Sequence, residues 1–199
     1  ENIVVPNAVT NFLETMHKRY PETKTSSRMT ILNMLSNRRP NFVRDYGWAI
    51  PEEQTLTAIK KFAQGEKSLE LAAGKGTWGT LLRAMGMNIV LTDKVQNQNG
   101  NVLALTADQA LDIHNNAKLL FTCWPEDGSE HWLADALSKF KGDKFAYIGE
   151  DRGGSTAGDD VFDKLDSEWE KVETFSMKHW YEVHDQLILY KRKPTEKTH

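Results

Sequence analysis

Residues 68–79 read SLELAAGKGTWG, and this stretch decides the fold that we expect for the chain. The apolar residues that precede Ala72 predict a buried strand, and Gly74 and Gly76 predict a tight turn after it. A helix is predicted to begin near Thr77. Glycine lets the backbone approach a ligand closely, and free amides at a helix N-terminus favour polar or anionic groups. This order of elements indicates a nucleotide-type cofactor site.

The glycines also satisfy the spacing of dinucleotide-binding folds. Gly74, Gly76 and Gly79 match the pattern G-x-G-x-x-G, whose glycines serve a tight turn, a pyrophosphate and the packing of the helix. The basic Lys75 within the turn is compatible with that interpretation. A nicotinamide-dependent oxidoreductase therefore stays open as one function.

Glu70 changes the balance between possible cofactors. It lies four residues before Gly74, where the strand is predicted to end. A carboxylate at this place would repel a pyrophosphate, but it would hold an ammonium group through a charge-assisted hydrogen bond of about 1.5–3 kcal/mol. S-adenosylmethionine offers an ammonium group and carries no phosphate. Asp93 ends the next predicted strand, residues 88–93, where an acid is expected to bind a ribose diol, and it fits either cofactor.

These residues resemble the class I S-adenosylmethionine-dependent methyltransferases, whose glycine motif runs acidic-x-Gly-x-Gly-x-Gly. Here Glu70 is the acid, Ala72 stands in the first glycine place, and Gly74 and Gly76 fill the other two. The resemblance implies that Glu70 holds the ammonium group, that residues 72–76 line the methionine portion, and that Asp93 binds the ribose. It also implies a Rossmann-like α/β fold with a seven-stranded sheet.

Alternating strands and helices predict a largely parallel sheet. The further strands are predicted at residues 101–106, 118–123, 144–149, 170–177 and 185–190, and the helices near 7–20, 26–37, 51–63, 77–86, 130–140 and 159–168, with Pro21 and Pro40 ending the first two. The last two strands have a short connection, which requires an antiparallel pair. We expect an N-terminal helical extension over 1–50, a methyltransferase-like domain over 51–193 and a disordered tail over 194–199.

Two further strand ends match the resemblance. Asp108 and Gln109 follow the third strand, where the family binds adenine, although Asp108 is equally suited to be a helix N-cap. At the acceptor-side strand end, amino-group methyltransferases often have an acid or amide before Pro-Pro-aromatic. Here Cys123 and Trp124 replace that polar residue before Pro125.

The resemblance extends to a little-characterised methyltransferase-like group that combines three segments. Trp-Ala-Ile-Pro lies at residues 48–51, Glu-x-x-Ala-Gly-x-Gly-x-Trp at 70–78, and Cys-Trp-Pro at 123–125, with Glu126 in place of a second proline. Tyr46 and Trp48 are expected to close over the methionine end, where a sulfonium favours aromatic faces by about 0.5–2 kcal/mol. Aromatic core packing explains both residues equally well.

The acceptor side has three candidate residues. Trp124 and Glu126 are expected to face the acceptor, with Cys123 beside the cofactor. His184, at the start of the last strand, is expected to reach the pocket as an acid or base. None of these candidates identifies the acceptor.

Composition limits the partners. The 199 residues include six Trp and are 39% hydrophobic, which suits one core, and no apolar run approaches the roughly 20 residues of a membrane span. Cys123 is the single cysteine, so an internal disulfide is excluded and the cytoplasm is the expected location. The six His lack zinc-like spacing, so no metal is expected.

Residues 17–44 hold seven basic residues and one acid. A solvated, positively charged arm explains this segment better than contact with nucleic acid does.

We therefore interpret the chain as an S-adenosylmethionine-dependent methyltransferase with an unknown acceptor. The atypical segment at Trp124-Pro125 keeps open a module of the same fold that binds the cofactor without methyl transfer. The literal glycine spacing keeps a nicotinamide-dependent oxidoreductase as a third interpretation.

Overall fold

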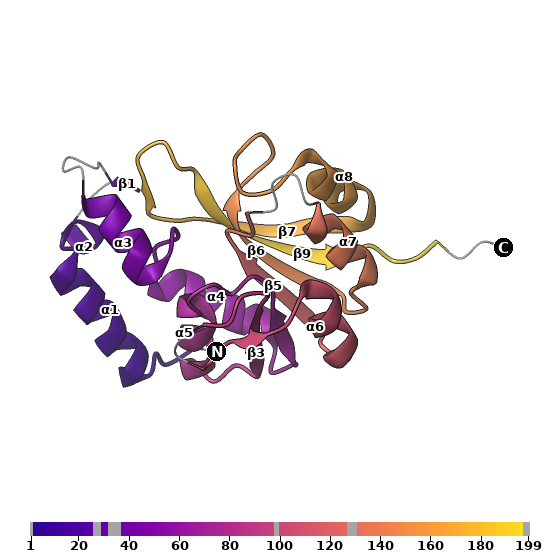
Figure 1. Cartoon of the computed structure of the whole chain (residues 1–199), viewed down its shortest axis with the longest axis horizontal. Helices are drawn as coiled ribbons and strands as arrows, with labels where there is room; N and C mark the ends of the chain where they lie inside the picture. The colour runs from indigo at the N-terminus through magenta and orange to yellow at the C-terminus, as the bar shows by residue number, and fades with distance from the viewer. Residues whose placement is uncertain (1, 26–28, 32–36, 98–99, 127–130, 197–199) are drawn as a thin grey trace.

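Seven strands form one sheet in the order β4-β3-β2-β5-β6-β9-β7 (Figure 1). They are β2 (Ser68–Glu70), β3 (Ile89–Asp93), β4 (Leu103–Ala104), β5 (Leu119–Cys123), β6 (Lys144–Glu150), β7 (Trp169–Ser176) and β9 (Asp185–Arg192). This computed structural model describes residues 2–25, 29–31, 37–97, 100–126 and 131–196. The α/β architecture expected from the sequence is confirmed.

The pairing of the strands sets where a ligand can bind. β2 runs parallel to both β3 and β5, with Leu69 opposite Val90 on one side and Leu120 on the other. The chain proceeds from β2 to one side of the sheet and returns to the other side at β5, so the strand order reverses beside β2. Open α/β sheets bind ligands at the carboxyl ends of the strands at such a switch point. β9 is antiparallel to β6 and β7, which confirms the predicted C-terminal hairpin.

The helices agree with most of the expected ranges. They are α1 (Asn7–Arg19), α2 (Glu22–Thr25), α3 (Arg38–Tyr46), α4 (Glu53–Ala63), α5 (Thr77–Ala84), α6 (Ala107–Ile113), α7 (Trp132–Lys139) and α8 (Asp159–Glu168). The alternative interpretation of Asp108 as an N-cap is wrong. Thr106 caps α6, because its side chain accepts a hydrogen bond from the Gln109 amide. The third strand is shorter than the predicted 101–106, since β4 covers only Leu103–Ala104.

The sheet separates two apolar cores, and β6 contributes to both. Ala146 and Ile148 belong to the core that contains residues of α1, α4 and α5, whereas Phe145 and Tyr147 belong to the core that contains residues of α6, α7 and α8. Alternate residues of a strand point to opposite faces, and this strand is buried on both of them. Helices therefore cover the two faces of the sheet, as in a doubly wound fold (Figure 1).

The helix predicted over residues 26–37 is wrong in its described part. Thr30–Ile31 form the short strand β1, which pairs in parallel with β8 (His179–Trp180), and residues 26–28 and 32–36 lie outside the described ranges. The chain is helical instead at α3, where Pro40 does not end a helix but occupies its first turn. Proline is tolerated there because the missing N–H has no intrahelical partner in any case.

The N-terminal residues are attached to the connection between β7 and β9, and Figure 1 shows β1 and α3 beside that connection. The Lys178 Nζ donates to the carbonyl of Thr23 at 2.9 Å, and the Lys178 amide donates to Glu52 at 3.0 Å. The rings of Phe42 and Trp180 lie 5.2 Å apart. The residues before α4 thus share a core with the sheet. The domain limits near residues 50 and 193 stay predictions, as does the disordered tail, of which residues 197–199 lie outside the described part.

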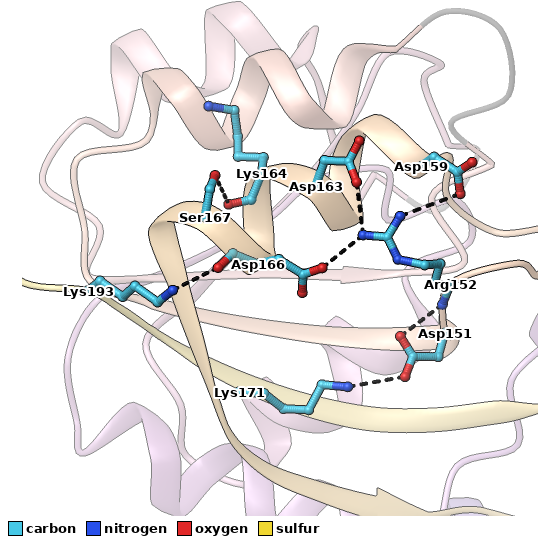
Figure 2. Close-up of polar contacts among 9 residues, drawn as sticks. All are labelled: Asp151, Arg152, Asp159, Asp163, Lys164, Asp166, Ser167, Lys171 and Lys193. Carbon is cyan, nitrogen blue, oxygen red and sulfur yellow. Dashed lines mark hydrogen bonds and ion pairs between the residues drawn. The ribbon is translucent and has the colours of Figure 1, made fainter.

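The loop after β6 is tied to α8 and β7 by ion pairs (Figure 2). Arg152 lies 3.0 Å from Asp163 and 2.9 Å from Asp166, and Lys171 lies 3.1 Å from Asp151. Each exposed pair contributes little to stability, about 0–1 kcal/mol. Together these pairs join the loop to α8 through Arg152 and to β7 through Asp151.

Candidate functional site

A cavity of about 710 Å³ opens at the carboxyl ends of β2, β3 and β5. Its walls come from the ends of these strands, from residues 105–108, from the start of α5 and α7, and from residues 43–49. The cavity therefore lies at the switch point where the sheet topology predicts a ligand.

Glu70 lies in the wall of this cavity at the end of β2, and its residue is only 2% exposed. The Oε1 atom is buried and has no hydrogen-bond partner among the described residues. Burial raises the pKa of the Glu70 carboxyl to about 8, with Asp93 adding to the increase and Arg83 opposing it. A buried oxygen without a partner carries a large desolvation cost, which a cationic ligand would offset.

The turn after β2 brings backbone to the cavity. Ala72, Gly74 and Gly76 all have positive φ, at 55°, 56° and 78°. A Cβ on Gly76 would lie 2.9 Å from Val102 Cγ2, so a larger residue would crowd this turn. Ala72 and Gly74 line the cavity, whereas Gly76 supports the turn behind it.

Ala72 should be less suitable than glycine for its own backbone conformation. A left-handed backbone conformation costs a non-glycine residue about 1–2 kcal/mol. A glycine avoids this cost, but its greater freedom in the unfolded chain lowers the stability of the folded protein by about 0.4–1 kcal/mol. We expect Ala72→Gly to raise the free energy of unfolding by up to about 1 kcal/mol, measured by urea denaturation. Ala73→Gly is the matched control, because Ala73 is not among the residues with positive φ, and it should lower stability. Equal losses for both variants would contradict this explanation.

Asp93 is fixed by two backbone amides. Its Oδ2 accepts from Gly74 N and its Oδ1 accepts from Val95 N, each at 2.8 Å. A carboxylate has about four acceptor sites, so Asp93 can still accept hydrogen bonds from hydroxyl groups of a ligand in the cavity that it lines.

Two threonines that sequence reasoning missed hold the neighbouring strand ends. Thr92 donates to the Glu70 carbonyl at 2.7 Å, and Thr122 donates to the Leu71 carbonyl at 3.0 Å.

Asp108 and Gln109 have different positions. Asp108 lines the cavity with its side chain 79% exposed. Gln109 is not among the lining residues, and its Oε1 accepts from the Thr106 amide at 3.0 Å as part of a capping box. Leu105 and Ala107 also line this part of the cavity.

Aromatic side chains form another part of the wall. The Trp48 and Trp124 rings are stacked, with centroids 4.9 Å apart and an interplanar angle of 11°. Tyr46 and Glu126 also line the cavity, and their contacts with cofactor and acceptor stay predictions. Trp132 and Asp135, which sequence reasoning missed, add side chains from α7.

His184 is not brought into the cavity wall. Its backbone amide donates to Glu150 Oε2 at 3.1 Å, and its ring lies 5.8 Å from that of His179. The neighbouring Asp185 instead reaches the site indirectly, because its Oδ1 accepts from Trp124 Nε1 at 2.7 Å. Burial raises the pKa of Asp185 to about 7, with the Trp124 hydrogen bond lowering it and the charge of Glu150 raising it.

Cys123 should react slowly with thiol reagents, although it lines the cavity. Burial raises the pKa of the Cys123 thiol, and the carboxyls of Asp185 and Glu70 raise it further. The thiolate is the reactive form, so little of it forms at neutral pH. We expect alkylation by iodoacetamide at pH 7.5 to be at least about tenfold slower in the native protein than in urea. Equal rates would contradict the described environment of this thiol.

Two further findings concern the part of the chain that the structure describes. It contains no group of three or more His, Cys, Asp or Glu side chains arranged to hold a metal ion. None of its helices has the length and apolar composition that crossing a bilayer requires.

Comparisons with known proteins found likeness in structure alone, since neither the protein-family models nor the curated proteins include a match. Magnesium protoporphyrin IX methyltransferase from Synechocystis PCC 6803, solved with bound SAM, superposes with a TM-score of 0.55 at 10% identity, covering 97% of this chain and 100% of that chain. The 1,6-didemethyltoxoflavin-N1-methyltransferase from Burkholderia thailandensis, solved with S-adenosylhomocysteine, superposes with a TM-score of 0.51 at 13% identity. This match covers 94% of this chain and 88% of that chain. The chain has the Rossmann-like α/β fold that these solved methyltransferases share.

A third similar structure is a protein from Streptococcus agalactiae described as a member of the NADB-Rossmann superfamily. It gives a TM-score of 0.51 at 13% identity and covers 75% of this chain and 72% of that chain. At such identities the likeness establishes the fold alone. The cavity of this fold brings together most of the residues expected at the cofactor and acceptor sides: Tyr46, Trp48, Glu70, Ala72, Gly74, Asp93, Asp108, Cys123, Trp124 and Glu126.

Proposed function

We propose that the chain binds S-adenosylmethionine in this cavity and transfers its methyl group to an acceptor that is not yet identified. The observation that carries the proposal is the Glu70 carboxyl, which is buried at the cavity with one oxygen lacking a partner among the described residues. An ammonium group would supply both the missing hydrogen bond and the opposite charge.

The residues present fit the other parts of this cofactor. The positive-φ turn from Ala72 to Gly76 would lie along the methionine portion, and Asp93 would bind the ribose hydroxyls. Asp108 would accept from the adenine amino group. The capping role of Gln109 leaves its side chain less available, so we assign the adenine contact to Asp108 before Gln109.

The bound cofactor would supply an electrophilic methyl group, and the protein would position the acceptor beside it. Holding an acceptor in line with the methyl group accounts for most of the rate that such a site needs. Trp48 and Trp124 would exclude water beside the acceptor, and Glu126 would face it. We assign no general base, because an acceptor with a free lone pair needs little proton abstraction.

A module that binds the cofactor without methyl transfer is the second candidate. The observation that favours it is the corner after β5, where Cys123 and Trp124 stand in place of an acid or amide. The raised pKa of the Cys123 thiol makes this group a weak acceptor of hydrogen bonds from a target nitrogen. The third candidate, a nicotinamide-dependent oxidoreductase, would place a pyrophosphate near Glu70, whose buried carboxyl has no positive charge to offer it.

Contact with nucleic acid is not part of the proposal, because much of the basic arm is paired within the protein. Arg38 lies 2.7 Å from Glu22, and Arg19 and Arg44 lie 3.4 Å and 3.1 Å from Asp45. Such internal pairs leave fewer charges for phosphates. A reducing compartment such as the cytoplasm stays a prediction from the single cysteine.

Two measurements test the proposal. Calorimetry should show binding of S-adenosylmethionine and S-adenosylhomocysteine and no binding of NAD, and binding of NAD alone would contradict it. Cell extract incubated with radiolabelled methyl donor and the protein should then gain label in one fraction among protein, nucleic acid and small molecules. Tight binding without any labelled fraction would favour the module.

A further inference from the structure

Trp124 is held by a residue that does not line the cavity. The indole Nε1 donates to Asp185 Oδ1 at 2.7 Å, and Asp185 is the first residue of β9 and only 2% exposed. Its Oδ2 is buried and has no hydrogen-bond partner among the described residues. One oxygen of this buried carboxyl therefore accepts from the indole, and the other has no hydrogen bond among the described residues. Burying a polar atom without a partner is unfavourable, so this arrangement needs an explanation.

The neighbouring buried carboxyl, that of Glu150, has different hydrogen-bond partners. Glu150 Oε1 accepts from Ser155 N at 3.0 Å, and its Oε2 accepts from His184 N at 3.1 Å. Glu150 therefore orders two backbone segments. Asp185 instead accepts a hydrogen bond from a side chain, the indole of Trp124.

The position of the indole matters because Trp124 is stacked on Trp48 within the cavity wall, and the Arg39 guanidinium lies over Trp48 at 5.5 Å from the ring centre. The backbone of Trp124 has a positive φ of 51°, and its amide donates to the Ile148 carbonyl at 2.9 Å. The backbone is thus fixed by β6, but the rotation of the indole about its side-chain bonds needs a second restraint. The hydrogen bond to Asp185 is that restraint.

We infer that Asp185 is a positioning residue, which holds the Trp124 indole against Trp48 and so fixes the acceptor-side wall of the cavity. This inference deepens the proposed function and rests on it for its catalytic consequence. Because Asp185 takes the indole N–H, Trp124 offers the cavity the carbon surface of its ring. The acceptor therefore meets a fixed apolar wall at this place and is oriented by it.

The test uses the electronic coupling of two stacked indoles, which produces a couplet in the far-ultraviolet circular dichroism spectrum. Trp48→Phe and Trp124→Phe identify the couplet by removing it. In Asp185→Leu we expect loss of more than half of the couplet, whereas Asp185→Asn should keep it, because the amide oxygen still accepts from the indole. Asp163→Leu is the matched control, since it makes the same change at an exposed position of α8. A full couplet in folded Asp185→Leu, or an equal loss in Asp163→Leu, would overturn the inference.

A second measurement covers the case in which Asp185→Leu does not fold. The indole N–H resonance of Trp124 is assigned in the unaltered protein by its absence in Trp124→Phe. It should exchange with solvent more slowly than the exposed-indole rate by about tenfold or more, as expected for a buried hydrogen bond. Exchange at the exposed rate would show that Asp185 does not hold this side chain.

The catalytic consequence has its own readout. Incorporation of labelled methyl into the extract fraction should fall about tenfold or more in Asp185→Leu and recover in Asp185→Asn, since small misplacements at a reacting centre cost large factors in rate. Failure of the proposed function would show as no binding of S-adenosylmethionine by the unaltered protein, with the couplet intact. Failure of this inference would show as an intact couplet in Asp185→Leu, with cofactor binding unaffected.

Discussion

Replacing Glu70 by glutamine should weaken the binding of S-adenosylmethionine by about ten- to a hundredfold, measured by calorimetry. A hydrogen bond to a charged group contributes about 1.5–3 kcal/mol, and each 1.4 kcal/mol is a factor of ten in affinity. Glutamine keeps the size of the side chain, so the cavity should keep its shape. Glu170→Gln, at an exposed position of β7, is the control and should leave the affinity unchanged. Equal affinities for E70Q and the unaltered protein would contradict the assignment.

The same substitution should abolish a release of protons. Burial and Asp93 raise the pKa of Glu70 to about 8, so the carboxyl of the free protein is mostly protonated at pH 7. An ammonium group favours the carboxylate and lowers this pKa on binding, which releases the proton. Calorimetry in buffers of different ionisation enthalpy should therefore find about one proton released at pH 7 by the unaltered protein and none by E70Q. Identical proton release from both would show that Glu70 does not meet the cofactor's charge.

Stability without cofactor should depend on pH for the same reason. The pKa of Glu70 is about 8 in the folded protein against 4.5 for the ordinary carboxyl, so the folded state binds more protons between these values. The free energy of unfolding should then fall as the pH rises from 4.5 towards 8, and Asp185, with its pKa raised to about 7, adds to this trend. Urea denaturation at several pH values should show a smaller decline for E70Q. A decline of the same size would contradict the described burial of Glu70.

The second large effect is expected for Gly79→Ala. An added Cβ would lie 2.3 Å from Glu70 Oε1 and 2.4 Å from Leu91 Cγ, closer than atoms can pack. Inserting a methyl group into a filled core costs about 1–3 kcal/mol, which outweighs the gain of about 1 kcal/mol that alanine brings to a helix. We expect a lower urea midpoint and loss of cofactor binding, because either α5 or Glu70 must move.

Ser138→Ala is the control for Gly79→Ala. It also introduces alanine into a helix, at an exposed position of α7, and should leave cofactor binding unchanged. A Gly79→Ala protein with normal stability and normal affinity would show that Gly79 does not provide room for the Glu70 carboxyl.

Local chemistry explains which parts of the fold could be predicted from the sequence. The strand, turn and helix around Glu70 depend on neighbouring residues, so glycines and apolar runs were sufficient to predict them. The pairing of β1 with β8 joins residues 30–31 to 179–180, and no local pattern indicates such a distant partner. The sequence pattern predicts Pro40 as the end of a helix, but this proline lies in the first turn of α3, where its missing N–H costs nothing.

The site shows the same division. Glu70 and Asp93 end strands and were predictable from their place in the pattern. The capping role of Gln109 had a signal in the sequence, because Thr106-x-x-Gln109 is a capping box. Trp132 and Asp135 enter the cavity only through the packing of α7. The contact of Asp185 with Trp124 joins the start of β9 to the residue after β5, which lies far away in the chain. Tertiary packing, which one sequence does not reveal, decides these positions.

A crystal structure of the protein with S-adenosylhomocysteine tests the central claim most directly. We predict that the ligand occupies the cavity at the ends of β2, β3 and β5, with its amino nitrogen about 2.7–3.2 Å from a carboxylate oxygen of Glu70. A ligand whose amino group lies away from Glu70, with Oε1 still lacking a partner, would contradict it.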